Sequence, residues 1–120
     1  MTQNEKDILL KDLCARLPYG VKGEKYTIRM DGEFVPLIDV EIIIAEDIIT
    51  LNGCPGYMIR PYLFPLSSMT EEQKTSHNFL KHSAYANPIK LVDWYNKNHF
   101  DYRGLIPMGS AIDATGKNIY

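Results

Sequence analysis

The three histidines and two cysteines of this 120-residue chain are the side chains best suited to bind a metal or act as a nucleophile. His77 and His82 are five residues apart. That spacing is about 140° around an ideal helix, so one helix cannot present both to the same metal ion. His99 is remote from them in the sequence. Because a zinc site needs several converging ligands, we predict no metal or other cofactor.

The cysteines do not stand in a setting that activates a thiol. Cys54 lies between Gly53 and Pro55, and the sequence predicts no helix N-terminus just after it. A packed loop thiol is therefore favoured over a nucleophile. Cys14 is expected to face the core from a helix. Without a secretion signal, both cysteines are predicted to be reduced and buried.

Residues 99–106 form the densest mixture of functional side-chain types in the chain. A histidine here could titrate near neutral pH, a tyrosine could stack, and an aspartate and an arginine could pair with each other. Such a group would recognise a peptide or an anion. The four candidate binding residues are His99, Asp101, Tyr102 and Arg103.

The same segment also fits a structural role, which we favour. Its polar residues would satisfy the backbone of an irregular loop. Its large side chains would seal the sheet as an aromatic clasp spanning residues 94–106. The clasp residues are Trp94, Tyr95, Phe100, Leu105 and Ile106.

The N-terminal part of the chain predicts a helix and then a β hairpin. Apolar residues recur at helical spacing within Glu5–Arg16, with Asn4 as the N-cap, and Pro18 ends the helix. Alternating apolar and polar residues then predict a strand that ends at Met30. Asp31-Gly32 after it is typical of a two-residue type I′ turn.

That turn would fix the register of the two strands. The expected cross-strand pairs are Met30–Glu33, Ile28–Val35 and Tyr26–Leu37. Near Pro36 the apolar residues change faces, so one extra residue must be absorbed there as a bulge or a break. The residues expected to share one side beyond it are Ile38, Val40, Ile42 and Ile44.

Two short strands are expected next. The first covers residues 48–51 and follows a turn at Glu46-Asp47, and the second covers residues 57–60 and ends before Pro61.

Two helices follow these strands. Thr70 to Gln73 is a capping box, which starts a helix that reaches Lys81. Asn87-Pro88 starts another, which ends near Asn98.

These elements predict an α+β fold in a single domain, residues 1–120, since the chain is too short for two separate cores. The expected order is an N-terminal helix, four or five antiparallel strands in an open or barrel-like sheet, two C-terminal helices and the clasp. The residues after Asp113 are expected to be loose.

Charge and hydropathy limit the classes of function. The first 73 residues carry an excess of acids, and the remainder carry a small excess of bases. The excess of bases is far smaller than that of a nucleic-acid-binding surface, so a nucleic-acid partner is disfavoured. The apolar-rich residues 37–51 are interrupted by four acids, and the N-terminus has no apolar leader. We therefore expect a soluble, cytoplasmic protein that does not bind membranes.

Three segments resemble stretches of small hypothetical proteins from gut Bacteroidetes and their prophages. They are Leu17–Val21, Pro61–Glu72 and His99–Ile106. The resemblance implies a phage or prophage origin and the cytoplasm of a bacterial host. It implies no activity and transfers no catalytic residues.

The leading hypothesis is a non-enzymatic phage or prophage accessory protein that binds a host or phage protein, with homo-oligomerisation left open. The motivation is the lack of a catalytic motif together with the exposed aromatic residues expected near the C-terminus. Two alternatives remain. One is a small hydrolase or transferase that uses Cys54 or a histidine. The other is weak nucleic-acid binding by the C-terminal half.

Overall fold

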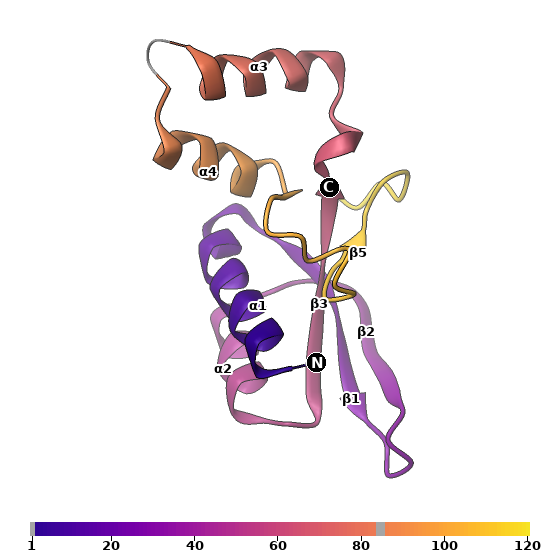
Figure 1. Ribbon diagram of the computed structural model, residues 1–120. Helices are drawn as coiled ribbons and strands as arrows, with labels where there is room; N and C mark the ends of the chain where they lie inside the picture. Colours follow the sequence, from indigo (N-terminus) through magenta and orange to yellow (C-terminus); the bar gives the residue numbers. More distant parts are fainter. Residues whose placement is uncertain (1, 84–85) are drawn as a thin grey trace.

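A mixed sheet with two helices on one side of it is the centre of the fold (Figure 1). The computed structural model describes residues 2–83 and 86–120, except for the side chains of Ile38 and Asp39. The strands are β1 (Lys22–Ile28), β2 (Phe34–Ile42), β3 (Tyr57–Pro65), β4 (Phe100–Asp101) and β5 (Ile112–Asp113). Their order is β2-β1-β3-β4, and β5 also pairs with β3.

The helices fall into two pairs. Helices α1 (Gln3–Arg16) and α2 (Ala45–Gly53) lie beside the sheet, while α3 (Glu71–His82) and α4 (Pro88–Lys97) lie beyond the end of β3 (Figure 1). The short 3₁₀ helices Leu17–Tyr19 and Leu66–Ser68 follow α1 and β3. None of the helices in the described part of the chain combines the length and apolar character needed to cross a membrane.

The predicted α+β class is confirmed, but the expected sheet is only partly right. Strands β1, β2 and β3 pair antiparallel, whereas β4 and β5 both run parallel to β3. The sheet is not closed into a barrel. Strand β3 also continues through Pro61, where the sequence predicted its end. Pro61 lies opposite Gly23 of β1, and a Cβ atom at residue 23 would lie 2.8 Å from the Arg60 carbonyl oxygen.

Helix α1 begins two residues earlier than predicted because its cap is Thr2, not Asn4. The Thr2 hydroxyl accepts from the Glu5 N–H, and the Glu5 carboxylate accepts from the Thr2 N–H, at 3.1 and 3.2 Å. These paired bonds form a capping box. Cys14 is exposed, so the prediction that it faces the core is wrong.

The β1–β2 hairpin has a three-residue loop in place of the predicted two-residue turn. The Gly32 N–H donates to the Arg29 carbonyl at 3.0 Å, and the Arg29 N–H donates to the Glu33 carbonyl at 2.7 Å. Gly32 has a φ of 88°, as expected of the left-handed residue that closes such a loop. The register is therefore one residue away from the prediction, so Ile28 pairs with Phe34 instead of Val35.

The predicted extra residue near Pro36 is confirmed. Tyr26 pairs with Pro36 but Lys25 pairs with Ile38, so Leu37 is the additional residue, and a second shift follows between Gly23 and Lys25. Val40, Ile42 and Ile44 are all exposed, and the side chain of Ile38 lies outside the described residues.

The strand predicted at residues 48–51 is wrong, because these residues belong to α2. Two consecutive isoleucines favour a strand locally. However, the Asp47 carboxylate accepts from the Ile44 N–H at 2.8 Å, which caps the helix. Burial of Leu51 on the core adds the tertiary contact that stabilises the helix over the strand.

The predicted starts of α3 and α4 are confirmed. Thr70 and Gln73 exchange the two bonds of a capping box, and the Asn87 side chain accepts from the Ile89 N–H. The clasp is packed as expected, with Phe100 and Leu105 fully buried. The C-terminal residues are not loose, because the Tyr120 hydroxyl donates to the Tyr62 carbonyl at 2.8 Å.

Candidate functional site

Asp101, one of the four predicted binding residues, has a structural role. It is buried, and its two carboxylate oxygens accept from the backbone N–H groups of Leu105 and Ile106, both at 2.9 Å. The carboxylate therefore organises the loop after β4 and has little surface with which to meet a partner.

Arg103 does not pair with Asp101 as expected, but with Asp12 of α1. The Arg103 Nε lies 3.2 Å from one Asp12 oxygen, and the Arg16 Nε lies 2.7 Å from the other. Both Asp12 and Arg16 are completely buried. Tyr102 lies against both guanidinium groups. Its ring centroid is 5.3 Å from the Cζ atom of Arg16 and 4.9 Å from the Cζ atom of Arg103.

This buried charge cluster joins the N-terminal helix to the clasp. One Arg16 nitrogen also donates to the Phe100 carbonyl of β4. The sequence contained a signal for it: residues 9, 12, 13 and 16 share one face of a helix, and two of them are ionisable. The partner Arg103 carried no such signal, because it lies 91 residues from Asp12.

His99 is half-buried, and its ring stacks on Tyr120 with centroids 3.6 Å apart. Burial, followed by the charges of Arg16 and Lys22, lowers the pKa of His99 to about 4. The expectation that His99 titrates near neutral pH is therefore wrong, and its ring is uncharged at pH 7.

We expect His99→Asn to flatten the dependence of stability on pH. In the unfolded chain a histidine titrates near pH ~6.5, above the folded value, so the unfolded state binds more protons as the pH falls from there toward 4. The stability that the uncharged His99 contributes is thus fully present above about pH 6.5 and is lost progressively below it. Because solvent screens the partly exposed ring, acidification should lower the free energy of unfolding of the wild type by about 1 to 2 kcal/mol through this residue.

Urea unfolding of wild type and variant at neutral and at mildly acidic pH measures this difference. Asparagine tolerates the φ of 61° at residue 99, so the backbone can be retained. Equal losses of stability on acidification in both proteins would contradict the assignment.

The other histidines and Cys54 do not form a common site. His77 Nε2 lies 2.6 Å from the Tyr95 hydroxyl, and the His77 ring stacks on Trp94 at 5.8 Å, so this side chain joins α3 to α4. Burial, and then the charges of Lys81 and His82, lower the pKa of His77. Cys54 is exposed rather than buried, and it directly follows α2, a helix that lies at the other end of the molecule from α3 (Figure 1). The described residues contain no cluster able to hold a metal ion.

Exposed apolar side chains gather on the β1–β2 hairpin and on the chain that follows it. Among the described residues, seven large ones lie between residues 28 and 44, each at least 43% exposed. We call them the hairpin patch: Ile28, Met30, Phe34, Leu37, Val40, Ile42 and Ile44. Isolated exposed apolar residues are ordinary, but so many on one hairpin make it a candidate binding surface.

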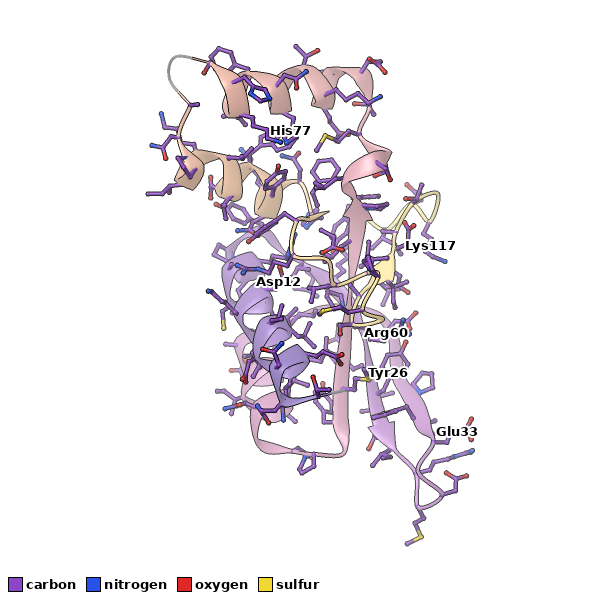
Figure 2. All side chains as sticks on the ribbon, viewed as in Figure 1. Asp12, Tyr26, Glu33, Arg60, His77 and Lys117 are labelled. Carbon is purple, nitrogen blue, oxygen red and sulfur yellow. The ribbon has the colours of Figure 1, made fainter. Side chains whose placement is uncertain are left out.

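A hollow of about 330 Å³ lies beside this patch on the outer face of the sheet. Its lining comes from all three antiparallel strands and from the C-terminal loop: Tyr26, Phe34, Met58, Arg60 and Gly109. Figure 2 labels Tyr26 and Arg60 on neighbouring strands, away from α1. We call this feature the Arg60 hollow.

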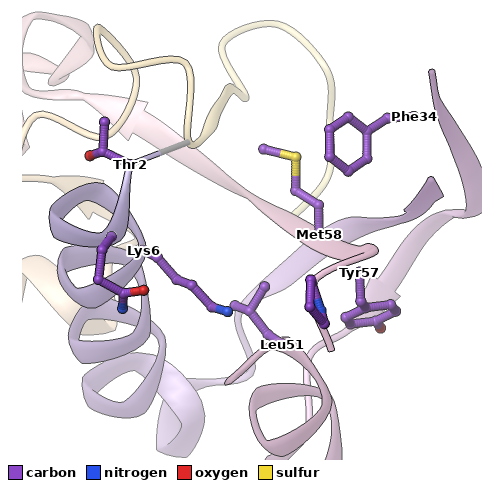
Figure 3. A pocket seen from close by; sticks show the side chains of 8 residues that line it. Thr2, Lys6, Phe34, Leu51, Tyr57 and Met58 are labelled. Carbon is purple, nitrogen blue, oxygen red and sulfur yellow. The ribbon is translucent and has the colours of Figure 1, made fainter. Parts of the chain in front are cut away.

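A second hollow, of about 310 Å³, lies where α1 begins and β3 begins (Figure 3). It shares Phe34 and Met58 with the Arg60 hollow. Its one ammonium group, on Lys6, donates to the Asn52 carbonyl at 3.4 Å. This hollow therefore extends the apolar surface but offers no unpaired charge.

The chain matches no known protein-family model, no curated protein and no solved structure. Function is therefore inferred from the hairpin patch and the hollows themselves.

Proposed function

We propose that this chain is a non-enzymatic accessory protein that binds another protein by strand addition to the free edge of β2. The hairpin patch is the observation that carries this proposal. In the described part of the chain, β2 pairs with β1 alone, although it is nine residues long. An edge strand offers unpaired N–H and C=O groups to a further strand, and apolar side chains beside them supply the contact area.

The charges of the edge favour a basic partner strand over a second copy of this chain. Strand β2 contains Asp39 and Glu41 and no lysine or arginine. The hairpin loop before it adds Asp31 and Glu33. The paired cations, Arg29 for Glu33 and Lys25 for Glu41, belong to the hairpin loop and to β1. Two copies paired through β2 would bring acids close to acids, which is unfavourable. A partner segment that alternates β-branched residues with lysine or arginine would complement both the apolar and the charged positions.

A labelled nine-residue peptide alternating valine and lysine tests this proposal by fluorescence anisotropy. We expect it to bind wild type and to bind Ile42→Lys at least about tenfold more weakly, a change of roughly 1.4 kcal/mol. Ile49→Lys is the matched control, because Ile49 on α2 is 71% exposed and the variant adds the same charge away from β2. Equal weakening by both variants, or equal binding of a valine–glutamate peptide, would contradict the proposal.

The resemblance to prophage proteins supports a partner from a bacterial host or its phage, and hence the cytoplasm as the place of binding. In this proposal Tyr102 and Arg103 stabilise the fold and do not contact the partner. Their engagement with Asp12 and Arg16 supports that role.

A further inference from the structure

Among the residues that the structure describes, the guanidinium group of Arg60 has no partner. It makes no hydrogen bond or ion pair with any described residue, and its Nε is buried. Leaving a buried donor unpaired costs free energy, and more when the group is charged. The guanidinium group of Arg16, which is completely buried, is by contrast paired with a carboxylate through its Nε, although its Nη1 has no partner among the described residues. A ligand that supplies an acceptor to Arg60 would remove this cost.

The acid nearest to Arg60 in the sheet is already engaged. Glu24 lies opposite Arg60 in the β1–β3 register, where an ion pair would be expected. Its two carboxylate oxygens instead accept from the hydroxyl groups of Tyr26 and Tyr62, one each. The two tyrosines therefore satisfy the Glu24 carboxylate, and the Arg60 guanidinium group faces the hollow without that partner.

The walls of the hollow are apolar on the sides that face Arg60. Tyr26 and Phe34 contribute aromatic rings, and Met58 contributes a flexible thioether. Gly109 lines the remaining side and adds no side chain there. A volume of about 330 Å³ is at the small end of the range for ligand pockets, roughly 300 to 1,000 Å³.

We propose that the Arg60 hollow binds a carboxylate carried on a small apolar or aromatic group. Arginine holds a carboxylate through two parallel N–H donors, which gives both affinity and orientation. The apolar group would lie against Tyr26, Phe34 and Met58. The carboxylate belongs either to a free organic acid or to the C-terminus of a peptide. This site shares Phe34 with the hairpin patch, but it uses the face of the sheet and not the edge of β2, so it is tested separately from strand addition.

Titration with 3-phenylpropionate, followed through the Met58 methyl signal by NMR, tests the proposal. The uncharged probe 3-phenylpropionamide has the same shape, and we expect it to bind at least about tenfold more weakly. A capped Ala-Phe dipeptide with a free C-terminal carboxylate, compared with its C-terminal amide, is the peptide arm. Tighter binding of 3-phenylpropionate assigns the carboxylate to a free organic acid, and tighter binding of the dipeptide assigns it to the C-terminus of a peptide.

Two variants show whether Arg60 itself binds the carboxylate. Arg60→Gln should lower the affinity for the carboxylate about tenfold or more, since it removes a charged donor pair. Arg29→Gln makes the same change of charge at an exposed arginine of the hairpin, which lies 3.7 Å from Glu33 and outside the hollow. It should alter the affinity less than about twofold. Equal binding of acid and amide, no shift of Met58 with either, or equal effects of the two variants would overturn the proposal.

Discussion

Replacing Asp12 with asparagine is expected to lower the free energy of unfolding by about 3 to 5 kcal/mol. The carboxylate lies between Arg16 and Arg103, and both Asp12 and Arg16 are completely buried. Without its charge, a buried guanidinium group remains uncompensated. Because a domain of this size is stable by only about 5 to 15 kcal/mol, the loss is a large fraction of the total.

Urea unfolding of three variants measures this effect. Asp7→Asn is the control on the exposed face of the same helix and should cost less than about 0.5 kcal/mol. The double variant Asp12→Leu/Arg16→Met removes both buried charges and should recover much of the loss, because well-packed apolar residues replace buried ion pairs at little cost. A loss below about 1 kcal/mol in Asp12→Asn would show that solvent reaches the cluster.

Phe100→Ala is expected to destabilise the protein by about 3 to 5 kcal/mol, the usual cost of truncating a buried aromatic side chain. Phe100 is 1% exposed and stands at the centre of the clasp. Its ring stacks on Trp94 at 5.4 Å and meets Phe64 edge-on at 6.4 Å. Its loss would leave a cavity between α4 and β3.

Thermal and urea unfolding of Phe100→Ala and Phe79→Ala form the matched comparison. Phe79 of α3 is 61% exposed, so the same truncation there should cost less than about 1 kcal/mol. Similar effects of the two substitutions would contradict the view that the clasp is part of the core.

The helices that the sequence predicted best are those that begin with a local capping signal. Thr70–Gln73 and Asn87-Pro88 fix the starts of α3 and α4 through bonds within a few residues. Helix α2 has an isoleucine at its N-cap position, so its capping bond comes from Asp47 inside the helix, and its isoleucines favour a strand. Its formation therefore depends on tertiary contacts made by Leu51. The parallel pairing of β4 and β5 with β3 is likewise a long-range contact.

Most of the candidate site could not be predicted from the sequence, because its geometry depends on the register of the β1–β2 hairpin. With the predicted two-residue turn, Val35 would have joined Ile28 on the outer face. The three-residue loop places Phe34 there instead, where it lines the Arg60 hollow. Alternation along β3 could have placed Met58 and Arg60 on one face. The engagement of Glu24 by two tyrosines, one of them 38 residues away, could not be read from the sequence.

Hydrogen exchange of the β2 amides tests the central claim, strand addition, most directly. With the valine–lysine peptide bound, amides of residues 34–42 that point away from β1 should exchange more slowly, while those of α3 should be unchanged. Exchange that slows in α3 and α4 and not in β2, or that does not change anywhere at saturating peptide, would contradict binding at this edge.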